Sequence, residues 1–284
     1  LHLSVSIHLL RALSSRKLTS TLSACENLHD IMRVLFLMAL LPAMVSAHYM
    51  WMERAKGKAV ITFSETPQHP GMKAFLAGVA NRTVVRLGVQ PAQQVTTLPI
   101  NLASLADGSG ELTADLPAAA NHSASMLEGA ALWGLFPEPG QASPPLLQYW
   151  FSAHHAAKAQ DWSYLDALST NRLSVTLRPG TPGQTSSKVE VVTNLDGNKL
   201  GNAVVEIFDD AGVKSMSVTT AADGTAMVEL PVGVAAFAKV LHREEAPGTD
   251  PLSGKPYETI LHSATHAMLV SSSPSSSSSS SSSS

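Results

Sequence analysis

Apolar and polar residues alternate in short runs along most of this chain, which is the pattern of half-buried β-strands. In the second half the runs recur about every ten residues, a spacing typical of a β-sandwich. Val, Ile, Phe and Thr occupy many of these positions, as strands prefer. Strands are predicted at 58–63, 83–89, 131–136, 146–151, 173–177, 188–193, 203–208, 216–220, 226–230 and 234–241, with strand-like sequence also at 257–261 and 267–270.

Turn residues divide these runs into two groups. Asp196-Gly197 and Asp223-Gly224 lie between runs of the second group, and Asp-Gly supplies the positive backbone torsions of tight hairpins. Residues 152–168 lack strand pattern and are predicted to be a long crossover with room for a helical turn. Pro and Gly at 179–183 mark a domain boundary. The predicted fold class is all-β, with β-sandwich-like domains at 48–178 and 185–270.

The two ends of the chain break this pattern. Residues 271–284 are almost entirely serine, which cannot bury apolar surface, so a disordered tail is predicted there. The apolar run Val34–Val45 follows Met32 and Arg33 and closes on small residues. We therefore expect a secretory signal peptide over 32–47, cleaved after Ala47. Residues 1–31 are expected to be absent from the mature protein, either as a transit peptide or as upstream sequence translated ahead of Met32.

Composition restricts the function classes. The 284 residues carry a net charge of −3, and the acidic excess grows beyond residue 47, which argues against a nucleic-acid partner. Only the run at 34–45 is strongly apolar, and it is shorter than the roughly twenty residues that cross a bilayer, so no transmembrane helix is expected in the mature protein. Cys25 is the single cysteine and precedes the cleavage point, which excludes disulfides from the mature chain. A secreted, extracellular or cell-surface location is expected.

Histidines are the most prominent candidate ligands. Imidazole suits copper, nickel, cobalt and zinc, whereas the mature chain has no thiolates for cysteine-type sites. If cleavage leaves His48 first, its terminal amine and its imidazole can close a chelate ring on a metal ion. The histidines from this point on are His48, His69, His122, His154, His155, His242, His262 and His266.

The spacing of the other histidines separates them into stronger and weaker candidates. His262 and His266 are four residues apart, so their side chains share one face in either a helix or a strand. His154 and His155 are adjacent and point in opposite directions if the chain is extended. A role of one inward polar residue and one solvated residue remains open for the pair at 262 and 266. His69 is expected in a constrained turn, and the sequons at Asn81 and Asn121 are expected to be exposed if the host glycosylates secreted proteins.

Motifs for catalysis are absent from the sequence. There is no Gly-x-Ser-x-Gly, no phosphate-binding glycine loop and no His-Glu-x-x-His. Glu53, Glu65 and Glu128 are isolated carboxylates, and alternation places Trp133 and Trp150 in the core rather than on a sugar-binding surface. A non-catalytic protein is therefore predicted.

Six segments in order along the chain resemble the secreted bacterial DUF4198 family: Ala47–Glu53, Val60–Glu65, Leu132–Phe136, Leu146–Trp150, Gly254–Tyr257 and Leu261–Thr265. That family is grouped with the substrate-specific components of nickel and cobalt uptake systems. The resemblance implies a signal peptide, an N-terminal β-rich region and an immunoglobulin-like C-terminal module. It also implies that His48 is paired with His262, and it leaves the roles of His154 and His155 open, because residues 151–159 depart from the family pattern.

The leading hypothesis is a secreted, non-catalytic β-sandwich protein that binds Cu, Ni or Co ion through His48, with His262 as the next ligand. His266, His154 and His155 are weaker ligand candidates, and a membrane transporter is a candidate partner. The first alternative is an adhesion module for cell-surface polysaccharide, without metal. Another is a copper-dependent oxidative enzyme. The simplest alternative makes His48 the first ordered residue of an edge strand and leaves the histidines scattered.

Overall fold

Strands dominate the computed structural model, which describes residues 48–68, 71–92, 94–121, 123–138, 141, 143–156, 161–179, 188–231 and 235–269. The compact unit begins at Ser46. The predicted upstream segment, signal peptide and serine tail, together with His69 and His122, lie outside the described residues. Within them the all-β class is confirmed, because the helices are limited to α3 (Lys73–Val79), α4 (Asp161–Leu168) and the short 3-10 turns η1 (Ala80–Arg82) and η2 (Ala118–Asn121).

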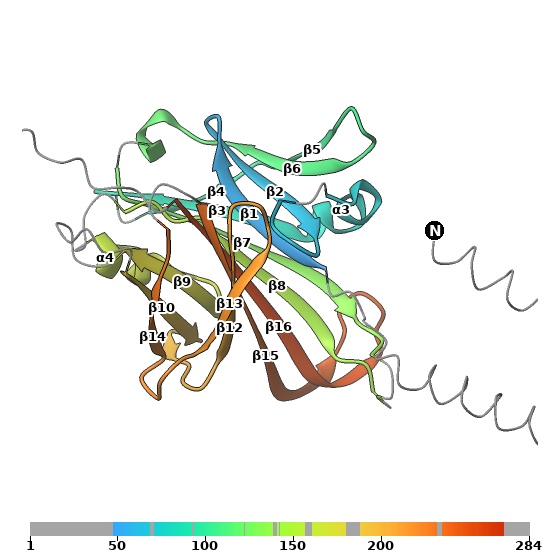
Figure 1. Ribbon diagram of the computed structural model, residues 1–284. Helices are drawn as coiled ribbons and strands as arrows, with labels where there is room; N and C mark the ends of the chain where they lie inside the picture. Colours follow the sequence, from blue (N-terminus) through green and yellow to red (C-terminus); the bar gives the residue numbers. More distant parts are fainter. Residues whose placement is uncertain are drawn as a thin grey trace, which may run out of the picture. The chain divides into compact units, whose positions relative to one another are not determined.

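The strands form three sheets (Figure 1). The first sheet has the order β1 (Tyr49–Ala55), β2 (Lys58–Ser64), β6 (Gly110–Asp115) and β5 (Asn101–Ser104). The second has the order β13 (Lys214–Thr219), β12 (Val204–Phe208), β15 (Ala235–Thr249), β16 (Pro256–Leu269), β8 (Leu146–Ser152), β7 (Ser125–Leu135), β3 (Thr83–Val89) and β4 (Val95–Leu98). In the third, β10 (Lys188–Leu195) pairs with β9 (Leu173–Pro179), β14 (Thr225–Glu229) and β11 (Asn198–Lys199).

The eight-stranded sheet joins the two halves of the chain. Its central strand, β16, is antiparallel to β15 and parallel to β8, with Ile260 opposite Leu146. Strand β9, which precedes the expected boundary, pairs with β10, which follows it. The regions predicted as two domains are therefore connected by main-chain hydrogen bonds, and the chain from Ser46 on forms one compact unit.

Alternation along β16 shows that the eight-stranded sheet is covered on both faces. Ala264 and Met268 point into a core shared with β9, β10 and β14. Leu261 and Ala267, at odd positions, pack against the core formed with β1, β2 and β6. A sheet buried on both faces needs apolar residues at both parities, which agrees with the adjacent apolar residues Leu146-Leu147 and Tyr149-Trp150-Phe151 of β8.

Strand β1 is held against the eight-stranded sheet by polar contacts as well as by its apolar side chains. The hydroxyl of Thr265 donates to the carbonyl of Met50 at 2.6 Å. Arg54 is largely buried and donates to the carbonyls of Ala120, Ser125 and Ala153 at 2.6–3.1 Å. Burial lowers the pKa of Arg54 to about 10, so its charge is retained at neutral pH. These bonds fix the position of the segment that begins at His48.

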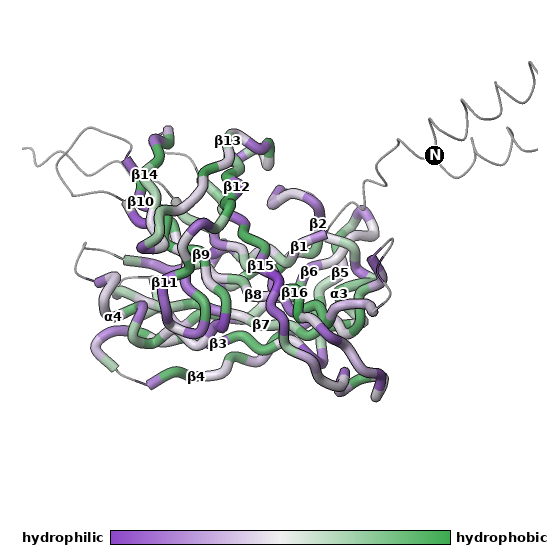
Figure 2. The backbone as a smooth tube through the Cα atoms, turned by 90° about the horizontal axis from the view of Figure 1, so that it is seen from below, coloured by the Kyte–Doolittle hydropathy of each residue, from purple (hydrophilic) through white to green (hydrophobic). Residues whose placement is uncertain are grey.

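The hairpin of β15 and β16 contains the longest strands, and its outer part is polar. From Leu241 to Thr249, β15 alternates between exposed and partly buried positions, and Figure 2 shows this stretch as largely hydrophilic. The turn is closed by Asp250, whose carboxylate accepts from the backbone N–H groups of Leu252 and Ser253.

Candidate functional site

His48 lies at the start of β1 and is the first ring of an aromatic stack. Its ring lies 5.3 Å from that of Phe63, with an angle of 14° between the planes. Phe63 stacks on Phe75 of α3, and Phe75 stacks on Trp133 at 3.8 Å. The four rings of His48, Phe63, Phe75 and Trp133 are called the aromatic stack below. Both terminal rings, His48 and Trp133, are partly exposed.

A β-bulge directs Trp133 onto this stack. In the pairing of β7 with β8, Leu132 is opposite Gln148 and Gly134 is opposite Leu147, so Trp133 is the extra residue. Gly134 has φ +107°, a backbone conformation that residues other than glycine rarely adopt. Bulges re-aim side chains in this way. Strict alternation had placed Trp133 in the core, whereas the bulge leaves it at the rim of the core, covered on one side by Phe75.

His262 lies elsewhere, in a hydrogen-bonded group between β8, β15 and β16. The indole Nε1–H of Trp150 donates to Nδ1 of His262 at 3.1 Å. On the other side of the ring, Nε2 lies 2.9 Å from the carboxylate of Glu244, which also receives Arg172. Since Nδ1 accepts, the neutral ring carries its proton on Nε2 and donates it to Glu244. Burial lowers the pKa of His262 despite the opposing effect of the Glu244 carboxylate.

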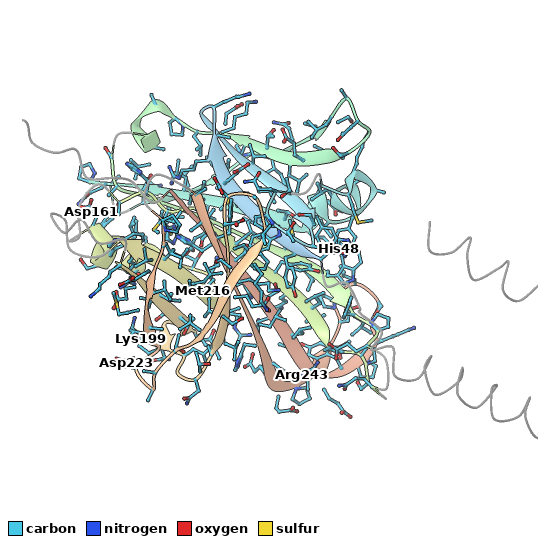
Figure 3. The ribbon with its side chains drawn as sticks, viewed as in Figure 1. His48, Asp161, Lys199, Met216, Asp223 and Arg243 are labelled. Atoms are coloured by element: carbon cyan, nitrogen blue, oxygen red, sulfur yellow. The ribbon has the colours of Figure 1, made fainter. Side chains whose placement is uncertain are left out.

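The structure does not bring His48 and His262 together. His262 shares the face of β16 that packs toward β9 and β10, since Ala264 and Met268 lie on that face. His48 stacks on Phe63, whose core includes β1 and the other face of the sheet. The two histidines therefore lie on opposite faces of the eight-stranded sheet. Figure 3 shows His48 well separated from Arg243, the neighbour of the His242 that pairs with His262.

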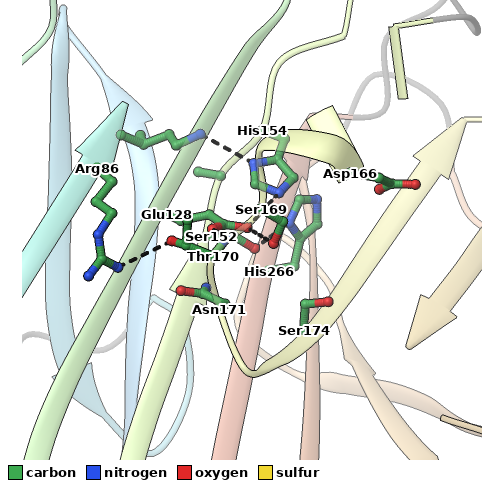
Figure 4. Close-up of polar contacts among 12 residues, drawn as sticks. Arg86, Glu128, Ser152, His154, Asp166, Ser169, Thr170, Asn171, Ser174 and His266 are labelled. Atoms are coloured by element: carbon green, nitrogen blue, oxygen red, sulfur yellow. Dashed lines mark hydrogen bonds and ion pairs between the residues drawn. The ribbon is translucent and has the colours of Figure 1, made fainter. Parts of the chain in front are cut away.

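The weaker candidates His154 and His266 do meet, in a buried polar cluster with Glu128 and Ser152 (Figure 4). The ring centres of His154 and His266 are 5.4 Å apart. Nδ1 of His266 lies 2.9 Å from the hydroxyl of Ser152, and Nε2 of His154 lies 3.6 Å from the carboxylate of Glu128. The parallel pairing of β8 and β16 creates this cluster by placing His266 opposite Ser152.

Glu128 anchors the segment between α4 and β9. Its carboxylate is fully buried and accepts from the hydroxyl of Ser169 at 2.5 Å and from the backbone N–H of Thr170 at 2.9 Å. Desolvation raises the pKa of Glu128, and these hydrogen bonds oppose the rise. No partner for this carboxylate could be predicted from the sequence, because its partners lie about forty residues further along the chain.

Burial also keeps the histidines of the cluster neutral. Desolvation, with the nearby charges of Arg54 and Arg178, lowers the pKa of His266 to about 3 and lowers that of His154 well below its usual value. Nδ1 of His154 accepts the backbone N–H of Leu127 at 3.2 Å, so the proton of the neutral ring is on Nε2. Nδ1 is the unprotonated nitrogen of this tautomer, and it cannot bind a metal ion while it accepts that hydrogen bond.

No group of three or more His, Cys, Asp and Glu side chains in the described part of the chain could hold a metal ion. The backbone of His155 forms a bridge with Ser125, which places this histidine beside β7 and away from the His262 group. His262 and His266 do share one face, as predicted, but both rings are buried and neither is solvated. The sequon asparagine Asn81 is exposed, as predicted.

The sequence did not indicate the aromatic stack. Phe63 lies in a predicted strand, but no element was predicted for 71–82, where α3 carries Phe75. Of the four tryptophans, Trp51 and Trp162 are buried, and Trp133 and Trp150 are partly exposed. Gly134 beside Trp133 was the one local signal of a bulge.

Comparisons with known proteins do not show a family for this chain. No family model matches the chain, and no curated protein matches it either. Similar solved structures include one of a 1.5-MDa bacterial ice-binding adhesin, studied for its retention at the host cell surface, at 9% identity and a TM-score of 0.22. Another is the BSP domain of a biofilm associated protein, at 11% identity and a TM-score of 0.17.

The alignments cover 79% and 76% of this chain but only 64% and 29% of those chains. TM-scores this low do not indicate a shared topology, so the all-β class rests on the strands themselves. The DUF4198 resemblance stays a prediction. Within the described ranges, no helix has the length and apolarity needed to span a membrane.

Proposed function

We propose that the protein is a non-catalytic, extracellular β-sandwich module that binds a cell-surface polysaccharide at the Trp133 end of the aromatic stack. The observation that carries this proposal is the β-bulge that sets Trp133 at the rim of the core, partly exposed and stacked on Phe75 at 3.8 Å. Bulges that re-aim one side chain are frequent at functional sites.

The chemistry of a sugar suits this surface. A pyranose ring has an apolar C–H face that packs on the face of an aromatic ring, while its hydroxyls need polar partners at the rim. Trp133 supplies a large rigid ring, and its stacking removes rotamer freedom before a ligand arrives, which lowers the entropic cost of binding. Arg82 lies beside the backbone of Trp133, since its guanidinium donates to the main-chain carbonyl of that residue at 3.0 Å.

A non-catalytic role agrees with how the reactive side chains are used. Glu128 holds the segment at 169–170, and His262 is bonded through both ring nitrogens. The side chain of His154 is 5% exposed, and His266 is buried. General acid or base catalysis needs a side chain that reaches the substrate proton, and these groups face the interior.

The test is a glycan array with the wild-type protein, followed by titration of the best ligand with tryptophan fluorescence as the signal. Trp133→Ala is expected to weaken binding at least about tenfold, since buried or stacked aromatic anchors dominate such contacts. Met227→Ala is the matched control, because Met227 is an exposed apolar residue on β14, at 59% exposure. Absence of any array ligand, or equal affinity in Trp133→Ala, would contradict the proposal.

A second candidate function keeps the metal at His48. His48 lies two residues inside the compact unit, and its ring orientation is set by Phe63. The pair His48 and His262 does not fit a common ion, because the rings lie on opposite faces of the sheet. The nearest carboxylate along the β1–β2 ladder is that of Glu65, because Tyr49 pairs with Ser64. The terminal amine and imidazole of His48, with Glu65, would form the ligand set, and a membrane transporter would be its partner.

Calorimetry with Cu²⁺, Ni²⁺ and Co²⁺ on protein that begins at His48 tests this second candidate. Binding must displace the proton of the terminal amine, whose usual pKa is about 8, so affinity is expected to fall with acidification. One alanine added before His48 is expected to abolish binding, whereas His262→Ala is expected to leave it unchanged. Equal heats with and without the added alanine would exclude this chelate.

A further inference from the structure

A concentration of unpartnered polar atoms lies between the eight-stranded sheet and the α4–β9 segment. Six buried side-chain nitrogen or oxygen atoms in the described residues have no hydrogen-bond partner. Four of the six belong to this region: Nε2 of His266, Nε1 of Trp162, Oδ1 of Asn171 and Nε of Arg178. Buried polar atoms without partners destabilise a fold, so four in one region require an explanation.

His266 and Trp162 both lie close to His154, and Arg178 lies close to Trp162. The ring of His154 lies 5.4 Å from that of His266 and 6.5 Å from that of Trp162. The guanidinium of Arg178 lies over the Trp162 ring at 5.6 Å. None of these pairs is in direct hydrogen-bonding contact through the unpartnered atoms. Because these rings pack directly on one another, a bridging molecule has to bind at their edges, where the unpartnered nitrogens lie.

The chemistry of the atoms identifies the bridging molecule. Trp162 Nε1 and Arg178 Nε are donors, Asn171 Oδ1 is an acceptor, and His266 Nε2 donates or accepts according to its tautomer. The charge of Arg178 is already compensated by Asp166 and Glu190, so an anion gains little here. A neutral molecule that both donates and accepts, and that is small enough for a closed interior, is water. Buried waters typically make two to four such bonds.

We infer that ordered water bound among His266, Trp162 and Arg178 joins α4 to the eight-stranded sheet. The water completes the hydrogen bonds of these three side chains, whose unpartnered atoms are all nitrogens. The site differs from the aromatic stack in position and ligand, so its presence does not depend on the proposed function.

Water-selective NMR on the uniformly ¹⁵N-labelled protein tests the inference. The indole N–H of Trp162 is expected to show a rotating-frame Overhauser cross-peak to water, opposite in sign to the diagonal, which separates bound water from hydrogen exchange. The indoles of Trp51 and Trp150 are internal controls, because they donate to Ser64 and His262 at 3.2 and 3.1 Å. They are expected to show no such peak. Trp162→Phe assigns the signal.

A second variant tests whether His266 shares the water. His266→Phe removes one polar partner and fills part of the site, so loss of the Trp162 cross-peak is expected. The inference is overturned if the wild-type Trp162 indole shows no Overhauser peak to water. It is also overturned if the peak persists unchanged in a folded His266→Phe variant. If that variant does not fold, the wild-type measurement alone decides the question.

Discussion

Replacing Glu128 tests whether one buried carboxylate holds the crossover segment to the sheet. In Glu128→Ala, the hydroxyl of Ser169 and the backbone N–H of Thr170 lose the acceptors that lie 2.5 and 2.9 Å away. A buried hydrogen bond to a charged group contributes about 1.5–3 kcal/mol, and an orphaned buried donor costs about 1–3 kcal/mol. Because these contributions overlap, a loss of about 3–5 kcal/mol in the free energy of unfolding is expected.

Glu128→Gln is the conservative comparison. The amide keeps the volume and one acceptor oxygen, but its nitrogen cannot accept from the second donor, so a loss of about 1–2 kcal/mol is expected. Urea unfolding followed by tryptophan fluorescence measures both variants. Glu245→Ala, at an exposed glutamate of β15, is the control and is expected to change stability by about 0.5 kcal/mol or less.

The pH dependence gives an independent reading of the same carboxyl. Burial raises the pKa of Glu128 in the folded state, so folding favours its protonated form. This contribution to stability is complete below the unfolded pKa of about 4.3 and is lost as the pH rises through the raised folded pKa. The Gln variant is expected to lack it. The anchoring role is refuted if Glu128→Ala lowers the free energy of unfolding by less than about 1 kcal/mol, instead of by the expected loss of about 3–5 kcal/mol.

Three further predictions concern the buried groups. His262→Ala is expected to lower the free energy of unfolding by about 2–4 kcal/mol, because the indole of Trp150 and the carboxylate of Glu244 lose their shared partner. An unchanged free energy in chemical denaturation would show that these hydrogen bonds do not stabilise the fold. Folding lowers the pKa of His266 to about 3. Its contribution to stability is therefore present above about pH 6.5 and is lost as the pH falls toward 3. His266→Gln is expected to flatten the dependence of the free energy of unfolding on pH over that interval. Gly129→Ala places a Cβ against the ring of Phe151 and is expected to cost about 1–3 kcal/mol, visible as a lower melting temperature.

Local patterns in the sequence were sufficient to predict most strands. The predicted run 83–89 coincides with β3, and 188–193 lies within β10, because alternation and β-branched residues are properties of the segment itself. The far half of β15 was missed because residues 242–245 are polar and charged. Its strand structure depends on the partner β16, not on its own composition.

The candidate site was less predictable because it depends on contacts between distant segments. The shared face of His262 and His266 follows from a spacing of four. Their separate environments do not, since Ser152 lies 114 residues from His266 and meets it only through the parallel β8–β16 pair. The position of Trp133 depends on a one-residue bulge. An extra residue in a strand shifts the alternation of inward and outward side chains, from which a core position is predicted. Register and bulges are tertiary properties that a single sequence specifies weakly.

The place of β16 in the sheet has a consequence for biosynthesis. Among the described strands it is the last to leave the ribosome, yet it lies between β15 and β8 at the centre of the eight-stranded sheet. Until residues 256–269 emerge, β8 and β15 each expose an edge that can pair with another chain, so premature termination is expected to yield aggregating fragments. The long sequence separation of the β8–β16 pair also predicts slow folding, since distant contacts must close large loops. A chaperone that shields nascent β8 would act during that interval.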